Sequence, residues 1–249
     1  MAGHSHWANI AAKKAIVDKK RGKLWSKLAR AIIVAAKAGG DPKTNLKLRY
    51  AIDAAKAVSL PKDNIERAIK TGTGELKAEA LEETLYEGYG PGGVAVLCEI
   101  LTDNRNRTAG EVRKIFELNG GQLGTTGCVA YLFDRKGLFL IPSVQTTEDR
   151  LMEIALEAGA DDVQHSGENL EVICEPSNFQ AVNDALTAAG LKPEVAQVSR
   201  LPKTTVDLDA ETGRTVLKLM EALDDHDDVQ NVSANFNIPD DAMTQINAG

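Results

Sequence analysis

The lysine and arginine side chains near the N-terminus are the residues of this sequence best suited to bind a ligand. Nine of them fall within 25 residues and are opposed only by Asp18: Lys13, Lys14, Lys19, Lys20, Arg21, Lys23, Lys27, Arg30 and Lys37. A solvated helix face usually mixes charges, because opposite charges four residues apart support the helix. Phosphate contact explains an unpaired row of cations, since each neutralised phosphate releases counterions. The cluster therefore predicts nucleic-acid binding, with a solvated surface or an acidic protein or membrane surface as alternatives.

A second candidate is the polar segment 103–108, which contains Arg105 and Arg107. It follows a predicted strand and opens a predicted helix. Arg107, together with the free N–H groups of the helix start, is able to hold a phosphate. Equally, Asn106 or Thr108 could simply cap the helix. The residue types leave both interpretations open.

Three other segments contain residue types that can bind ligands, but their spacing favours structural roles. His4 and His6 have no further metal ligands nearby, and residues 224–228 lack the spacing of a calcium loop, which favours a solvated loop. Residues 90–93 are followed by a strand and by no Lys-Ser/Thr pair, so they predict a tight turn between strands. No catalytic constellation is recognisable. We therefore expect no enzyme, cofactor, metal or small-molecule substrate.

The charge is unevenly distributed along the chain. Residues 1–70 hold 16 Lys/Arg against 5 Asp/Glu, whereas the remaining residues hold 13 against 31. Such asymmetry is typical of an arm that binds a polyanion, joined to an acidic body. The three cysteines, Cys98, Cys128 and Cys174, lie far apart in apolar runs and predict buried free thiols in a reducing compartment. No apolar stretch is long enough to span a membrane, so we expect a cytoplasmic protein.

The elements that carry the N-terminal cations are predicted to be helices. Residues 22–37 place apolar side chains on one face and Lys23, Lys27, Arg30 and Lys37 on a stripe roughly 120° away. A second helix is predicted to start near Asn45, which can cap it, and to run to residue 58. A third begins at Pro61 and ends at Gly72. Together they predict a small three-helix bundle.

From residue 83 onward, the spacing of the apolar residues changes from a helical period to one that includes strands. Strands are predicted at 85–89 and 94–101, a helix at 108–118 and a strand at 128–133. Residues 137–201 then follow the order strand, helix, strand, strand, helix, strand, which is the ferredoxin-like pattern. The predicted strands are 137–141, 161–164, 170–174 and 195–201, and the predicted helices are 148–157 and 179–189. A last helix, 215–223, and strand, 229–236, would complete the first unit.

The predicted fold class is therefore α+β: an N-terminal three-helix bundle followed by two α/β domains of ferredoxin-like pattern. The last α/β domain is expected to be inserted into the middle one. The expected domains are a basic helical nucleic-acid-binding domain at 1–75, a discontinuous middle domain at 80–134 plus 205–240, and the inserted domain at 135–204.

Several motifs make the chain similar to a known family. They cover residues 2–134 almost continuously: Ala2-Gly3-His4-Ser5, Trp7-Ala8-Asn9-Ile10, Arg21-Gly22-Lys23, Gly39-Gly40-Asp41-Pro42, Pro61-Lys62-Asp63-Asn64-Ile65, residues 86–93, residues 101–108 and residues 120–131. In these the chain resembles the YebC/PmpR family, which includes the mitochondrial translational activators of cytochrome c oxidase. The resemblance implies three domains around a central cleft and nucleic-acid binding without catalysis.

The expected function is a regulator of gene expression that binds nucleic acid, with a DNA-binding transcriptional regulator as the leading hypothesis. The alternative is a translation factor associated with the ribosome and ribosomal RNA. No recognition helix with side chains set for base edges is identifiable, which favours recognition of the phosphate backbone. An enzyme using the central cleft, and a scaffold whose acidic domain docks a basic partner, are the rivals from other classes.

Overall fold

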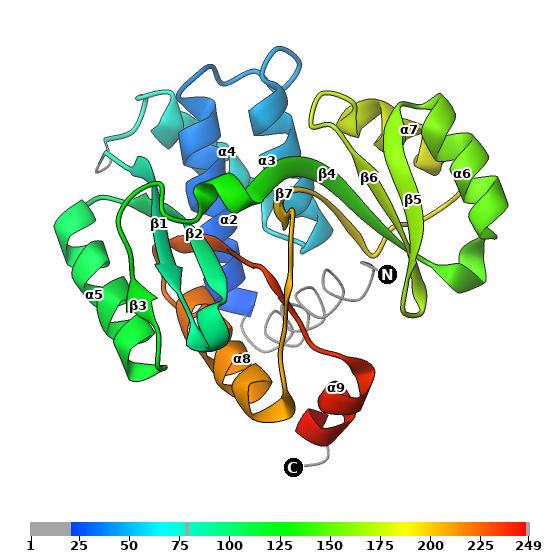
Figure 1. Cartoon of the computed structure of the whole chain (residues 1–249). Coiled ribbons are helices and arrows are strands. Elements are labelled where there is room, and N and C mark those ends of the chain that lie inside the picture. Colours follow the sequence, from blue (N-terminus) through cyan, green and yellow to red (C-terminus); the bar gives the residue numbers. More distant parts are fainter. Residues whose placement is uncertain (1–20, 78–79, 248–249) are drawn as a thin grey trace.

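The computed structural model of the chain describes residues 21–77 and 80–247, and it has the predicted α+β fold. Figure 1 shows the N-terminal helices beside two sheets, each with helices packed on one face. Among the described residues, no helix has the length and apolar composition needed to cross a bilayer.

The N-terminal helices are α2 (Arg21–Ala36), α3 (Leu46–Ala57) and α4 (Lys62–Gly72). Their apolar faces meet in one buried cluster that includes Ile32, Leu48 and Ile65. Asn45 caps α3 as predicted, because its side chain accepts the Leu48 N–H. Pro61 occupies the cap position of α4, one residue before the predicted place. The predicted arrangement of three helices is confirmed.

The first sheet has the order β3-β1-β2-β9 and is antiparallel throughout. Its strands are β1 (Glu82–Tyr89), β2 (Ala95–Thr102), β3 (Gln122–Leu123) and β9 (Val229–Ala234). Helices α5 (Arg105–Leu118) and α8 (Ala210–Asp224) share a buried core with one face of this sheet. Both faces of β2 are buried, which explains its mostly apolar sequence, interrupted at the partly exposed Glu99.

The predicted strand at 128–133 is wrong. Residues 130–132 form a short 3-10 helix (Ala130–Leu132), and the strand that follows begins only at Phe133. The N–H groups of Gly127, Val129 and Ala130 all donate to the carboxylate of Glu87, so they are not available to a sheet. The apolar side chains of the segment still pack, because Val129 and Phe133 cover the second face of β2.

The second sheet has the order β5-β6-β4-β7, the predicted ferredoxin-like arrangement. Its elements are β4 (Phe133–Pro142), α6 (Glu148–Glu157), β5 (Ala160–Ser166), β6 (Asn169–Cys174), α7 (Phe179–Ala188) and β7 (Val195–Pro202). Both helices lie on one face of the sheet and enclose a core around Phe139 and Val172. Figure 1 shows β4 leading out to this sheet and β7 returning from it.

The C-terminal part contains elements that the apolar pattern did not predict. Strands β8 (Val206–Asp207) and β10 (Phe236–Asn237) pair in parallel, and α9 (Asp240–Asn247) follows. Helix α8 begins at Ala210, earlier than predicted, because the Asp209 side chain caps it by accepting the Thr212 N–H. Return of the chain at α8 and β9 to the first sheet supports the proposal of a domain at 135–204 inserted into a middle domain.

Candidate nucleic-acid interface

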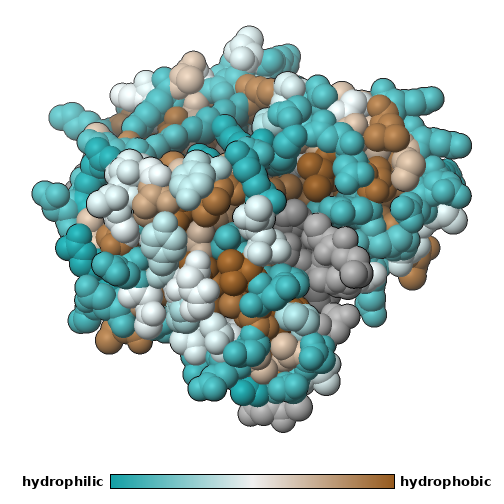
Figure 2. Space-filling view, in the orientation of Figure 1, coloured by the Kyte–Doolittle hydropathy of each residue, from teal (hydrophilic) through white to brown (hydrophobic). Residues whose placement is uncertain are grey.

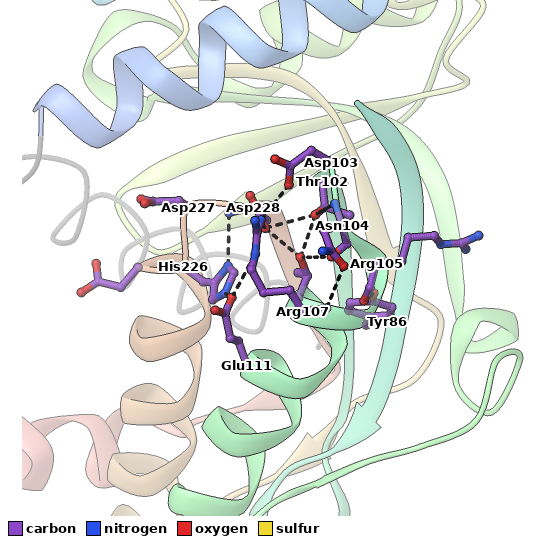
Figure 3. A network of polar contacts seen from close by, with 12 residues as sticks. Tyr86, Thr102, Asp103, Asn104, Arg105, Arg107, Glu111, His226, Asp227 and Asp228 are labelled. Carbon is purple, nitrogen blue, oxygen red and sulfur yellow. Dashed lines mark hydrogen bonds and ion pairs between the residues drawn. The ribbon is translucent and has the colours of Figure 1, made fainter. Parts of the chain in front are cut away.

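The most connected polar group in the described part of the chain is the carboxylate of Asp228, at the start of β9. Only 4% of its side chain is exposed. Arg30 donates to one oxygen at 2.6 Å, and Arg107 donates to the other at 2.6 Å. The hydroxyls of Thr108 and Thr102 contact that second oxygen at 2.7 and 3.2 Å, as Figure 3 shows in part. Residues from three separate segments therefore converge on one buried carboxylate.

The protonation of Asp228 follows from these contacts. Burial by itself raises the pKa of a carboxyl group, because it disfavours the charged form. Hydrogen bonds from Thr108, Arg107 and Arg30 outweigh that effect and lower the pKa of Asp228 to about 2. The group is therefore an anion at neutral pH, and it fixes the positions of the two arginines that contact it.

The cation stripe of α2 contacts the loop 224–228, which we call the acidic loop. Lys23 Nζ donates to the Asp225 carbonyl at 2.8 Å, and Lys27 Nζ donates to the Asp224 carbonyl at 2.5 Å. Lys27 also pairs with the Asp224 carboxylate at 3.1 Å. These carbonyls lie at the C-terminal end of α8, where the helix dipole favours cations. The stripe thus caps α8 and joins the N-terminal helices to it.

The prediction that residues 224–228 form a solvated loop is wrong. Asp228 is buried, and Arg30 binds both its carboxylate and, at 2.9 Å, the carbonyl of Asp227. Lys37, the last cation of the stripe, donates instead to the Leu81 carbonyl at 2.5 Å. The partners in the acidic loop lie 197 to 202 positions from α2 in the chain, so the residues around α2 gave no sign of them.

The residue in segment 103–108 that caps helix α5 is not one of those proposed from the sequence. The Asn104 side chain accepts the Arg107 N–H at 3.1 Å, which makes Asn104 the cap of α5 and corrects the prediction of Asn106 or Thr108. Arg107 reaches Asp228 and Asp103, and so lies beside Arg30. Arg105 is more exposed, at 59% of its side chain, and donates to the Thr84 hydroxyl at 2.7 Å.

Four cations of the predicted interface, Lys13, Lys14, Lys19 and Lys20, lie outside the described residues, and Arg21 begins α2. The structure brings Arg30 and Arg107 together at Asp228 and places Lys23 and Lys27 along the neighbouring acidic loop. Their assignment to nucleic-acid binding stays a prediction.

A histidine joins the same network. Asp228 donates its N–H to His226 Nδ1 at 3.1 Å, and His226 Nε2 lies 2.9 Å from Glu111. The Nδ1 atom is therefore an acceptor, which leaves Nε2 to donate to Glu111. Although Glu111, His226 and Asp228 offer atoms within 4.8 Å of one another, Arg30 and Arg107 already neutralise Asp228. Two guanidinium groups at that carboxylate disfavour a metal ion there.

Sequence reasoning also missed Glu87, a buried carboxylate in β1. Its two oxygens accept N–H groups from Gly127, Val129 and Ala130 at 2.6 to 2.8 Å. Burial raises its pKa, yet the three N–H donors lower it overall. Glu87 thereby fixes the loop 124–130, beside which the exposed rings of Tyr89 and Tyr131 lie. The strand also contains the exposed Glu82 and Glu83, so the sequence offered no signal that Glu87 alone is buried.

A central cleft of about 550 Å³ lies where the three sets of elements meet. Its ionisable lining residues are Lys47, Glu83, Glu99, Arg135 and Arg200. Glu83 pairs with Lys47, and Glu99 pairs with Arg200 at 3.2 Å. Within the described part of the chain, the lining has no histidine, cysteine or serine, and its glutamates and lysine are held in ion pairs. The enzyme hypothesis gains no support from this cleft.

Comparison with known families agrees with this architecture. Residues 5–75 match the family described as the TACO1/YebC protein N-terminal domain. Residues 81–236 match the TACO1/YebC second and third domain. The chain belongs to the TACO1/YebC family. The resemblance inferred from the motifs is thereby confirmed.

Relatives of this TACO1/YebC chain match it along its whole length. A protein of Rhodopirellula baltica is 57% identical, over 98% of this chain and all of its own length. A protein of Desulfatibacillum aliphaticivorans is 53% identical, over 98% of this chain and 99% of its own. Both are named probable transcriptional regulatory proteins. The crystal structure of a conserved hypothetical protein of Aquifex aeolicus, 50% identical, superposes with a TM-score of 0.84 and covers 95% of this chain and 98% of its own.

Proposed function

We propose that this protein is a regulator of gene expression that binds nucleic acid without catalysis, with DNA as the leading target. The distribution of charge carries the proposal: the first 70 residues hold 16 Lys/Arg against 5 Asp/Glu, on a body that is strongly acidic. Phosphate neutralisation by such a segment drives binding, while the acidic body repels nucleic acid from the rest of the surface. The names of relatives 53–57% identical support the regulatory role.

The contacts of α2 indicate which cations are free to bind phosphate. Lys23, Lys27 and Arg30 already donate to the acidic loop, and the same hydrogen atoms cannot bind a phosphate at the same time. We therefore assign the first phosphate contacts to Lys13, Lys14, Lys19, Lys20 and Arg21, and we add the exposed Arg105 of α5. The α2 stripe and Arg107 contact phosphate only if the acidic loop releases them.

Reversal of Lys19, Lys20 and Arg21 to Glu tests the proposal. If about five phosphates are contacted, the logarithm of affinity falls against the logarithm of salt concentration with a slope of about −3.5 to −4.5. The reversed protein should bind a DNA duplex much more weakly and with a flatter slope. Fluorescence anisotropy across a salt series measures both quantities.

The matched control reverses Arg113, Lys114 and Lys218, which are exposed and lie on α5 and α8. This variant has the same net charge as the first, so a purely global charge effect would weaken both equally. Equal loss in the two variants, or no loss in the first, would contradict the assignment.

A translation factor that binds ribosomal RNA is the alternative, because recognition of the phosphate backbone suits RNA as well as DNA. Crosslinking in cells, followed by sequencing of both bound DNA and bound RNA, separates the two. Recovery of promoter DNA supports transcriptional control. Recovery of ribosomal RNA, without promoter DNA, replaces that hypothesis with the alternative.

A further inference from the structure

The central cleft contains two arginines, and the interactions described so far account for only one of them. Arg135 and Arg200 are direct partners in the antiparallel pairing of β4 and β7, so their side chains lie on the same face of the sheet. Both line the cleft. Like charges directly opposite each other destabilise a sheet, unless an anion lies between or beside them.

Only one of the two arginines has an anionic partner among the described residues. Arg200 Nε lies 3.2 Å from Glu99 Oε1, and 23% of its side chain is exposed. Arg135 is exposed toward solvent and forms no ion pair with a residue in the described ranges. The two carboxylates of the cleft do not form an ion pair with Arg135, because Glu99 pairs with Arg200 and Glu83 pairs with Lys47.

A second donor in the lining also has no acceptor. The amide nitrogen of Gln230, on β9, is buried and has no hydrogen-bond partner within residues 21–77 and 80–247. Buried polar groups almost always have partners, so an unpaired donor points to a ligand or water that accepts its hydrogen bond. The cleft thus presents a guanidinium and an amide, both as donors, around one space.

Much of the remaining lining is apolar, beside the paired side chains of Lys47, Glu83 and Glu99. Ala31 and Val34 of α2 face the space together with Ala51 of α3, and Leu85 and Ile100 line it from the sheet. In Figure 2, the face of the molecule in view is mostly hydrophilic, and hydrophobic residues show toward its middle. A volume of about 550 Å³ lies within the usual range for small-molecule sites, which combine apolar walls with few polar groups.

We propose that the central cleft binds a nucleoside phosphate, with its phosphate at Arg135 and Arg200. A planar guanidinium matches a phosphate with two parallel hydrogen bonds. The apolar walls then contact the sugar or base, and Gln230 donates to the ligand. The nucleoside phosphate is either a free nucleotide or one unit of a nucleic-acid strand. This site is separate from the N-terminal cations and does not depend on them.

Titration calorimetry on the full-length protein tests the site, with each of the four ribonucleoside monophosphates at fixed ionic strength. Arg135→Gln should weaken binding at least tenfold, because it removes a charged hydrogen-bond donor and breaks no described ion pair. Arg150→Gln, an exposed arginine on α6, is the matched control and should bind like the unmodified protein. Inorganic phosphate should bind more weakly than the monophosphates, because it cannot contact the apolar walls.

Unchanged binding by Arg135→Gln, or no binding of any monophosphate, would overturn the inference. So would loss of monophosphate binding in the Lys19, Lys20 and Arg21 reversal, since the ligand would then occupy the N-terminal segment. If that reversal loses DNA binding alone, the cleft site and the proposed function both stand. If it leaves DNA binding intact, the proposed function fails while the Arg135 result still decides the cleft.

A short single-stranded oligonucleotide separates the two sources of the phosphate. If Arg135→Gln weakens oligonucleotide and monophosphate binding equally, the cleft holds one unit of a strand. If only monophosphate binding weakens, the ligand is a free nucleotide. Either result supports the site and identifies its occupant.

Discussion

At the scale of single residues, Asp228 is the group on which the interface depends most. Its replacement by Asn leaves Arg30 and Arg107 close together without the anion that separates them. Breaking a buried charge pair usually costs about 3 kcal/mol or more. Because 31% of the Arg30 side chain and 44% of the Arg107 side chain are exposed to screening by water, we expect Asp228→Asn to lower the free energy of unfolding by roughly 2–3 kcal/mol, measured by urea denaturation. Asp227→Asn, an exposed carboxylate in the same loop, should change it by less than about 0.5 kcal/mol.

The stabilising effect of Asp228 should also depend on pH. Its pKa is about 2 in the folded protein and 3.8 without the fold, so the folded state favours the ionised form. The contribution is therefore fully present above pH 3.8 and is lost as the pH falls through 2. The stability difference between the unmodified protein and Asp228→Asn should shrink between pH 4 and pH 2. A difference that stays constant over this range would show that the charge of Asp228 does not stabilise the fold.

Glu87 gives a second prediction at this scale. The carboxylate of Glu87 accepts hydrogen bonds from the N–H groups of Gly127, Val129 and Ala130. In Glu87→Gln, an NH₂ group replaces one of the two accepting oxygens and faces these donors. Loss of buried hydrogen bonds should cost about 1–3 kcal/mol and speed hydrogen exchange at these three amides. Glu82→Gln, on the same strand but exposed, is the control. Unchanged exchange rates would mean that another group fixes the loop.

At the scale of elements, α2 and the acidic loop form one electrostatic contact. The Lys27–Asp224 ion pair is part of this contact, and 11% and 22% of the two side chains are exposed. A double-mutant cycle with Lys27→Met and Asp224→Asn should give a coupling free energy of about 1 kcal/mol that weakens as salt rises. Additive effects of the two substitutions would show that the carbonyl contacts alone hold the helix.

The element predictions from sequence succeeded wherever apolar spacing decided the structure. Residues 148–157 were predicted as a helix and are helical, because Leu151 and Ala155 face one core. The segment 128–133 failed for a reason that spacing does not reveal. Its apolar residues are buried as expected, but Glu87 takes its N–H groups, and a strand needs those groups free.

At the scale of the whole molecule, the second sheet and its helices should fold by themselves. Residues 133–202 contain all four strands of that sheet, both helices and nearly all of the core around Phe139. Among the described residues, the one partner of this core from outside the segment is the ring of Tyr50, which packs edge-on to Phe179 at 5.2 Å. We expect the isolated segment 131–204 to unfold cooperatively in a circular-dichroism melt. A segment without a transition would show that this region depends on the N-terminal helices.

The sequence by itself determined the secondary-structure periods, the charge asymmetry and the family motifs, because these depend on residues close together in the chain. Only the tertiary structure decided what the basic stripe contacts. Lys27 and Asp224 are 197 residues apart, and Lys23 and Asp225 are 202 apart. An ion pair forms wherever the fold brings two charges together, and no local pattern encodes that meeting. The same holds for the cleft, where residues of the N-terminal helices and of both sheets enclose one space.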